Sequence, residues 1–283
     1  MAAQRPARST PTLHRARVRR TERLTPHMVR VVLGGEGLAA FDAGEFTDHY
    51  VKLVFPLPDV SYPEPFDMAH IRAELPRDQW PRTRTYTVRA WDPQTRELTV
   101  DFVVHGARGL AGPWAAAAQP GDEIMFLGPG GAYAPDPTAD WHLLAGDESA
   151  LPAIAAALSR MPAGAVVHAF IEVAGPEERQ ELAAPPGAEI TWVYRDAAPV
   201  GRQLVRFVRD LTFPPGRLQA FVHGEAGFVK ELRRLLRVEH AIAREALSIS
   251  GYWRTGHDED GWQAGKRDWN AQVEAEQEAA TAA

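Results

Sequence analysis

Short hydrophobic runs separated by turn residues dominate the first half of the chain and predict β-strands. The runs cover residues 16–20, 28–33, 50–55, 85–90, 98–104 and 123–127. Asp92-Pro93 is a typical turn between two of them. One alanine-rich segment, 111–118, predicts a short helix with Pro113 in its first turn, where proline is favoured. Several short strands with a single helix indicate a small antiparallel barrel.

A proline-rich segment, residues 56–81, lies between the third and fourth predicted strands. It contains Pro63, Pro65 and Pro76 in addition to the prolines at its two ends. This composition predicts a long excursion over the surface rather than an element of the core.

After Pro135-Asp136-Pro137 the pattern changes to an alternation of apolar strands and helices. The predicted strands are 141–145, 166–173, 189–194, 219–223 and 247–250, and the predicted helices are 151–160, 177–182, 203–209 and 227–238. Such an alternation indicates a parallel, doubly wound α/β sheet. The sequence therefore predicts a β-barrel domain over 14–136, an α/β domain over 140–253 and a C-terminal extension with an acidic tail over 254–283.

Composition excludes several classes of protein. The 283 residues include no cysteine, which excludes disulfides, thiolate zinc sites and cysteine-ligated iron–sulfur clusters. Any redox chemistry must therefore come from a bound organic cofactor or from the substrate. A net charge of −6 argues against nucleic-acid binding. Because neither a run of about 20 apolar residues nor an apolar signal segment is present, we expect a cytoplasmic protein without stable membrane association.

The tetrapeptide Arg84-Thr85-Tyr86-Thr87 on the fourth predicted strand carries the most informative chemistry. Alternate side chains of a strand face the same way, so Arg84 and Tyr86 share one face. An arginine fork can hold a pyrophosphate through two parallel hydrogen bonds, and an aromatic ring beside it can pack on a flavin or a ribose. Thr87 can meet the N5 edge of a flavin. On its own, an ordinary amphipathic strand with an exposed arginine explains the tetrapeptide equally well.

The next strand runs through Asp101-Phe102-Val103-Val104-His105-Gly106 into a glycine-flanked turn at 109–112 that opens the predicted helix. A helix N-terminus offers free backbone N–H groups and the positive end of the helix dipole to a pyrophosphate. By itself this is a structural strand–turn–helix. Together with the preceding tetrapeptide, it is a specific signal for a phosphate-containing cofactor.

Eight segments of the sequence resemble the siderophore-interacting protein family, a branch of the ferredoxin–NADP reductase-like flavoproteins. They are LTPHMVRVVLGGEGL, YVKLVFP, RTYTVR, DFVVHG, GPWAAAAQPGDEIMFLGPGG, WHLLAGDESALPAIAAAL, FVHGEAGFVKELRRLL and SGYWRTGHDEDGW, in order from about Arg17 to Trp262. The resemblance implies an FAD-binding barrel followed by an NAD(P)H-binding α/β domain.

The resemblance also implies which barrel residues bind FAD. They are Arg84, Thr85, Tyr86, Thr87, Val103, His105, Ala111, Gly112, Trp114 and Ala115. Relatives often have Ser or Thr at the position of Gly112 and Pro at that of Leu110, so here the phosphate contacts are left to backbone amides. No catalytic acid or base is expected, since placement of flavin, nicotinamide and substrate is the main task.

In the second domain, Asp147-Glu148-Ser149 occupies a strand-to-helix turn where a nucleotide phosphate would sit. Glu172 lies near the end of the next strand, where an acid commonly meets an NAD ribose. Arg179 and Arg195 suggest a 2′-phosphate instead, so the choice between NADH and NADPH stays open. His223-Gly224-Glu225 resembles the loop on the nicotinamide side in the family.

Several polar or aromatic clusters have ordinary structural explanations. The histidines lack metal-ligand spacing, so no metal site is expected. His257-Asp258-Glu259-Asp260 is interpreted as a solvated acidic loop rather than a metal cluster. Tyr252-Trp253 either stacks near the flavin or anchors the C-terminal segment.

The expected function is reduction of Fe(III) in ferric siderophores by NAD(P)H through FAD. Because such chelates are often anionic, we expect Lys52, one of three lysines, and Arg254 to bind the substrate. One alternative is a flavin reductase or an electron carrier partnered by ferredoxin. Another is a protein that binds the siderophore without reducing it. The sequence leaves the siderophore, the electron donor, the oligomeric state and the role of the C-terminal extension open.

Overall fold

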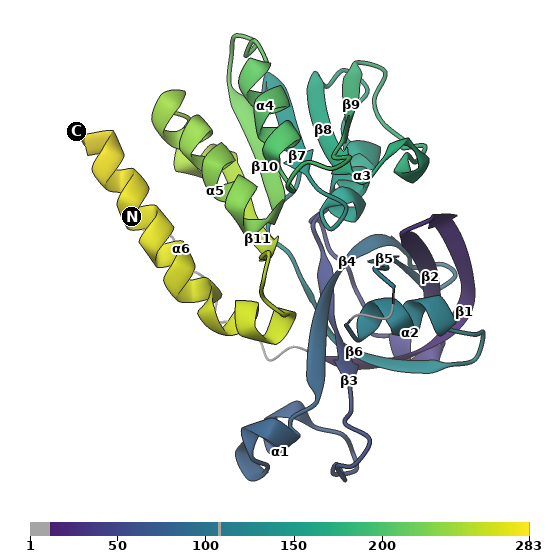
Figure 1. Ribbon diagram of the computed structural model, residues 1–283. Helices are drawn as coiled ribbons and strands as arrows, with labels where there is room; N and C mark the ends of the chain where they lie inside the picture. Colours follow the sequence, from purple (N-terminus) through teal and green to yellow (C-terminus); the bar gives the residue numbers. More distant parts are fainter. Residues whose placement is uncertain (1–11, 107–108, 283) are drawn as a thin grey trace.

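A computed structural model describes residues 12–106 and 109–282, which form a closed β-barrel beside a parallel sheet flanked by helices (Figure 1). The barrel strands are β1 (Leu13–Thr25), β2 (Met28–Gly34), β3 (Tyr50–Phe55), β4 (Arg82–Asp92), β5 (Glu97–Val103) and β6 (Glu123–Gly130). They pair antiparallel in the order β1-β2-β5-β4-β3-β6. The inward positions form one core that contains Leu53, Val100 and Phe126, each fully buried. The predicted barrel is confirmed.

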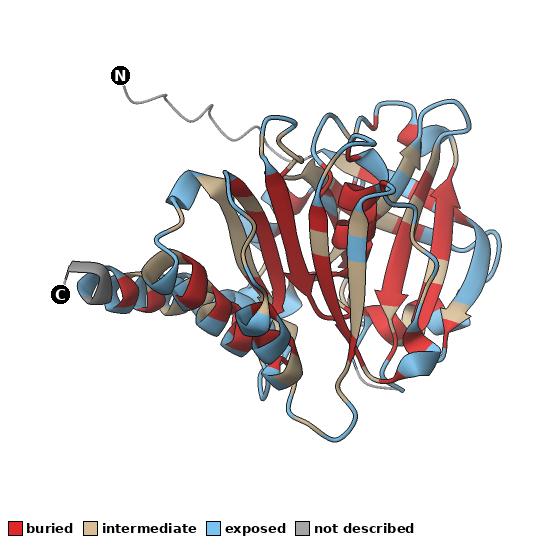
Figure 2. Ribbon diagram, turned by 90° about the horizontal axis from the view of Figure 1, so that it is seen from above, coloured by how far each residue is buried: buried red, intermediate tan, exposed pale blue. Residues whose placement is uncertain are grey.

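The second half of the chain forms a five-stranded sheet in the order β11-β10-β7-β8-β9, and all of its pairs are parallel. The strands are β7 (Trp141–Gly146), β8 (Val167–Val173), β9 (Ala188–Tyr194), β10 (Leu218–Glu225) and β11 (Leu247–Trp253). The helices of this half are α3 (Leu151–Arg160), α4 (Arg202–Asp210) and α5 (Ala226–Arg234). Every residue of β7 is buried, as expected for a central parallel strand covered on both faces (Figure 2). The predicted α/β sheet is confirmed.

Shorter elements complete the chain. They are α1 (Met68–Glu74), α2 (Ala111–Ala117), the single turns Glu36–Leu38, Arg77–Gln79, Pro176–Glu178 and Arg244–Ala246, and the π-helical turn Leu235–Glu239. The cluster on the α3 side of the sheet also includes Met28 from β2, so the two halves share apolar contacts. Among residues 12–106 and 109–282, none of the helices combines the length and apolar character of a membrane span.

Two expectations for loops and helices are wrong. The helix predicted at 177–182 is replaced by the single turn Pro176–Glu178, because Glu178 is buried and its carboxylate binds Thr25 Oγ1 and, at 2.6 Å, His27 Nδ1. The segment 56–81 contributes to a core after all. It contains α1, whose Met68 and Ile71 pack with β3 and β6 in a small apolar cluster.

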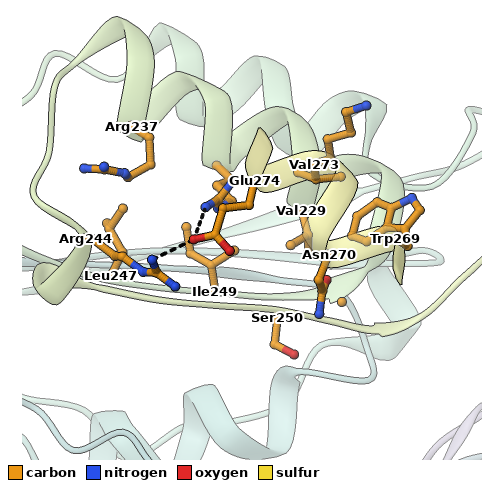
Figure 3. Close-up of a pocket in the computed structure, with 13 residues that line it drawn as sticks. Val229, Arg237, Arg244, Leu247, Ile249, Ser250, Trp269, Asn270, Val273 and Glu274 are labelled. Atoms are coloured by element: carbon orange, nitrogen blue, oxygen red, sulfur yellow. Dashed lines mark ion pairs between the residues drawn. The ribbon is translucent and has the colours of Figure 1, made fainter. Parts of the chain in front are cut away.

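The C-terminal extension forms a 24-residue helix, α6 (Glu259–Ala282), which runs from the barrel along α5 (Figure 1). Trp262 near its start is 2% exposed. Further along, the carboxylate of Glu274 faces Arg244 at 2.6 Å and Arg233 at 3.8 Å beside a cavity of about 210 Å³ (Figure 3). Lys230 on α5 pairs with Glu276 at 2.6 Å. The extension is therefore a helix that packs along the α/β half, and its start contacts β4 of the barrel.

Candidate functional site

The tetrapeptide on β4 lies where the barrel meets the last strand of the sheet. The ring of Tyr86 packs on Phe102 with centroids 4.4 Å apart, and burial raises the pKa of the Tyr86 hydroxyl, which keeps it neutral. Thr87 is 7% exposed and is hydrogen-bonded to the hydroxyl of Tyr252 on β11. β4 therefore places an aromatic ring and a threonine at the junction, where Tyr252 anchors β11 to it, and the role of Tyr86 and Thr87 in flavin binding stays a prediction.

Arg84 is turned toward the start of α6. Its Nη1 and Nη2 lie 3.2 and 3.1 Å from the two carboxylate oxygens of Asp260, and its Nε lies 3.4 Å from Glu259 Oε2. The amide of Thr85 donates to Glu259 Oε1 at 3.1 Å. The expectation of a solvated acidic loop is therefore wrong for Glu259 and Asp260, because the positive charge of Arg84 holds both against β4.

The second predicted flavin segment, α2, starts close to the end of β5. A Cβ at position 112 would lie only 3.1 Å from the carbonyl oxygen of Val103, so Gly112 lets the helix approach the strand. Leu110 before the helix gives no side-chain cap to its first N–H groups. Trp114 packs on Phe102 at 5.6 Å. His105 is exposed, and its ring lies 6.2 Å from that of His27.

These residues have the chemistry that FAD requires. A dinucleotide flavin needs a cation for its pyrophosphate, aromatic and apolar walls, and a few polar atoms at the ring edge. Arg84, Tyr86 and Thr87 supply one of each on a single strand, and α2 adds the backbone amides of its first turn. The donor set on β4 and α2 therefore fits FAD.

The turn after β7 is arranged differently, because Asp147 itself accepts the hydrogen bonds of the nearby N–H groups. Asp147 is fully buried, and its carboxylate accepts from Ser149 N at 2.9 Å, Glu225 N at 2.9 Å and the indole of Trp253 at 2.8 Å. The amides of Ala150 and Leu151 bind the Asp147 carbonyl oxygen. Burial, and then Glu148, raise the pKa of Asp147 to about 6. The donors that a nucleotide phosphate would need are thus occupied within the turn.

Glu172 and Arg195 form a buried network rather than an open ribose or phosphate site. Glu172 is fully buried and accepts from the amides of Gly201 and Leu204, at the start of α4, at 2.8 and 3.4 Å. Arg195 lies between Glu172 at 3.3 Å and Glu148 at 2.5 Å. Arg179, the other candidate for a 2′-phosphate, is exposed.

His223 and Glu225 at the end of β10 also have internal partners. The His223 ring stacks on Phe221 at 3.8 Å, and its Nε2 lies 3.0 Å from Ser248 Oγ. Burial, and then the charge of Lys266, lower the pKa of His223 to about 3, so the ring is neutral. The Glu225 carboxylate caps α5 through Gly227 N at 2.5 Å. The nucleotide-binding role of these residues stays a prediction.

Two lysines, one on β3 next to β4 and one on α6, interact through their charges. Lys52 is exposed on β3 and pairs in register with Thr85 of β4. Lys266 on α6 donates to Ser250 Oγ at 3.1 Å, and its pKa is lowered by burial and then by the charge of Lys52. Within the described part of the chain, no ion pair includes Lys52 or Lys266. The charge interaction with a carboxylate that the structure shows is that of Lys52 with Glu259, which favours the ionised form of Glu259 without forming an ion pair.

Sequence reasoning missed Lys266, although the scarcity of lysine that singled out Lys52 applied to it equally. The second substrate candidate, Arg254, contacts an aromatic ring of α6, and its role in substrate binding stays a prediction. Its guanidinium lies over the ring of Trp269 on α6, 5.9 Å from the centroid. No three His, Cys, Asp or Glu side chains of residues 12–106 and 109–282 are grouped so as to hold a metal ion.

Both halves of the chain match known families. Residues 17–133 match the family described as siderophore-interacting FAD-binding domain, and residues 139–256 match siderophore-interacting protein. The chain is 36% identical to ferric vibriobactin reductase of Vibrio cholerae, covering 86% of this chain and 90% of that protein. It is 32% identical to the NADPH-dependent ferric-chelate reductase of Escherichia coli, covering 83% and 91%. The crystal structure of a siderophore utilization protein from T. fusca superimposes with a TM-score of 0.77 at 42% identity, covering 89% of this chain and 96% of that one.

Proposed function

We propose that this chain, which belongs to the siderophore-interacting protein family, is a ferric-siderophore reductase that uses FAD and NADH or NADPH. The observation that carries the proposal is the position of Lys52, which is exposed on β3 and in register with Thr85 of the Arg84–Thr87 strand. The named activities of the relatives from V. cholerae and E. coli, both reductases of ferric chelates, support it. FAD, when bound, supplies the conversion of a hydride into single electrons.

The barrel residues are proposed to hold and orient the flavin. Arg84 binds the pyrophosphate through its planar fork, helped by the backbone amides at the start of α2. Tyr86 provides an aromatic wall, and Thr87 lies at the edge of the ring system. These assignments follow from the fit between the donor set and the cofactor. They need no titrating group on the protein, which agrees with the neutral state of Tyr86.

The two lysines are proposed to bind the ferric chelate. An anionic chelate is attracted by two ammonium groups that form no direct ion pair with a described carboxylate, and their position on β3 and α6 directs it to β4. Once the iron is ferrous, a chelator built from hard oxygen ligands holds it less well. Release of Fe(II) then needs no metal ligand from the protein. The iron is therefore a substrate and not a resident metal of the protein.

The electron donor is proposed to be a nicotinamide nucleotide at the carboxyl ends of the sheet strands, the usual ligand position in such a sheet. The E. coli relative, named as NADPH-dependent, supports this choice. A ferredoxin donor is the alternative. Reduction of an imported chelate for iron use places the proposed activity in the cytoplasm.

The decisive experiment follows the flavin under anaerobic stopped flow. The purified protein, which should release FAD and not FMN on denaturation, is reduced with NADPH and mixed with a ferric siderophore or with oxidised ferredoxin. We expect faster reoxidation by the ferric siderophore, with Fe(II) captured by a ferrous-specific chelator. Faster reoxidation by ferredoxin would identify an electron carrier instead. A protein that binds ferric siderophore but no flavin would be a non-reducing binding protein.

A further inference from the structure

The first turn of α6 contacts the residue that is proposed to bind the FAD pyrophosphate. Asp260 presents both carboxylate oxygens to the Arg84 fork at 3.1 and 3.2 Å. Glu259 approaches Arg84 Nε at 3.4 Å and also accepts the Thr85 amide at 3.1 Å. This bidentate geometry is the one in which an arginine binds a phosphate.

These contacts, together with one to a neighbouring carbonyl, use most of the N–H groups of Arg84. Nη1 also donates to the Thr83 carbonyl oxygen at 2.8 Å, and only 12% of the Arg84 side chain is exposed. A pyrophosphate oxygen reaches the fork only when Asp260 leaves it. Two carboxylates beside a doubly charged pyrophosphate would also repel it. The same arginine therefore cannot satisfy both partners at once.

We propose that Glu259 and Asp260 form an intramolecular anion that competes with the FAD pyrophosphate for Arg84, so that docking of the first turn of α6 and flavin binding exclude each other there. The inference rests on the proposed role of Arg84 in binding FAD. Because coupling between two binding events is reciprocal, flavin binding releases the first turn of α6 from β4, and neutralising its carboxylates tightens flavin binding.

The rest of α6 stays in place when its first turn leaves. Its far part is fixed to α5 by the pair Lys230–Glu276 at 2.6 Å, and Arg244 binds Glu274 at 2.6 Å. Before the helix, the amide of Thr255 donates to Glu225 Oε1 at 3.1 Å, and the following Gly256 adopts φ +81° with open space around it, so the connection from β11 is held at Thr255 and can turn at Gly256. The residues between Gly256 and the buried Trp262 can therefore move as a short unit, while Trp262 and the later pairs hold the rest of the helix.

The test measures FAD affinity of the full-length apoprotein by quenching of FAD fluorescence at low ionic strength. Asp260→Asn should bind FAD about tenfold more tightly than wild type, which corresponds to the loss of one charge-assisted contact, and Glu259→Gln with Asp260→Asn should bind more tightly still. Glu276→Gln removes one carboxylate from the far part of α6 and should leave the affinity within about twofold. Unchanged or weaker binding by the Asp260 variant would overturn the proposal.

Hydrogen exchange gives a second readout that does not depend on the variants. Adding FAD to the wild-type apoprotein should accelerate amide exchange at 259–262 and leave exchange at 270–278 unchanged. Slower exchange at 259–262 would show that FAD and the acidic turn bind together, against the proposal. If the wild type and all variants bind no FAD, the proposed function itself fails. If they bind FAD but Asp260→Asn does not strengthen binding, only the competition fails.

Discussion

The barrel and the sheet use their charged residues in different ways. On the barrel, Lys52 is exposed, and Arg84 is met by carboxylates from the first turn of α6 and by one neighbouring carbonyl. In the sheet, Asp147, Glu172 and Glu225 are all buried and accept backbone amides from other segments or from the helix that follows. All five stand where a ligand-binding residue is expected. This difference shows that the position of a residue does not by itself make it a ligand-binding residue. A ligand needs hydrogen-bond donors or acceptors that the fold has not already used.

The strongest test of this contrast is Arg195→Ala in the sheet. It leaves Glu148 and Glu172 buried without their cation, so we expect a loss of about 3–5 kcal/mol in the free energy of unfolding, measured by urea denaturation. Arg209→Ala removes an exposed pair with Glu239 and should cost about 0–1 kcal/mol. Equal losses in the two variants would mean that the buried network does not hold the sheet together.

The buried Asp147 of the sheet makes the free energy of unfolding depend on pH. Its pKa is about 6 in the folded protein against 3.8 ordinarily, so between these values the folded state keeps a proton that the unfolded state has released. Stability from this group therefore falls as pH rises from about 4 to 6, by roughly 3 kcal/mol, and is constant above that. The difference in unfolding free energy between wild type and Asp147→Asn should change by this amount over that range. A difference that does not vary with pH would contradict the raised pKa.

Arg84→Ala tests the barrel side, where binding should suffer more than folding. Loss of a bidentate charge-assisted contact is expected to weaken FAD binding about 10- to 150-fold, or ~1.5–3 kcal/mol, and the apoprotein should also lose some stability because Arg84 pairs with Glu259 and Asp260. Arg96→Ala, which removes an exposed pair with Glu36 on the barrel, serves as the matched control. If Arg84→Ala retains full flavin occupancy, Arg84 has no part in the flavin site.

The smallest expected effect is that of Lys52→Ala. Reoxidation of the reduced flavin by an anionic ferric siderophore should slow by about threefold at low ionic strength, and the difference should disappear in high salt because screening weakens attraction. Reduction by NAD(P)H should be unaffected. Lys230→Ala, whose lysine is paired with Glu276 on α6, should behave as wild type. Equal reoxidation rates at every salt concentration would remove Lys52 from the substrate site.

The architecture could be predicted from the sequence because strand periodicity and strand–helix alternation are local signals. The strand predicted at 166–173 is β8, Val167–Val173. The helix predicted at 177–182 fails because Glu178 makes a long-range contact with His27 on the barrel. The helix α6 is missing from the predicted elements, although Trp262, Trp269 and Val273 recur at a helical spacing within 254–283; the partners of this face on α5 and β11 are what the segment alone does not give.

For the candidate site, the sequence identifies the residue types and the strand but not their partners. Arg84 meets Asp260 across a separation of 176 residues, and Asp147 meets Trp253 across 106. Neither periodicity nor local motif encodes such pairings. A sequence can therefore nominate a carboxylate as a ligand, but only the folded chain shows whether its oxygens are already in use.

The hydrogen bonds of Asp147 also set a mechanical property of the molecule. One carboxylate oxygen accepts both the Glu225 amide and the Trp253 indole, so the ends of β7, β10 and β11 are fastened at a single point. β11 is the edge strand and leads directly into α6. Tension applied to the C-terminal helix would first separate α6 from the rest of the molecule. It would then act on the hydrogen bonds of Asp147 with Glu225 and Trp253. We expect a pulling experiment to show two rupture events from that end, a weak one for the helix and a stronger one for the edge strand.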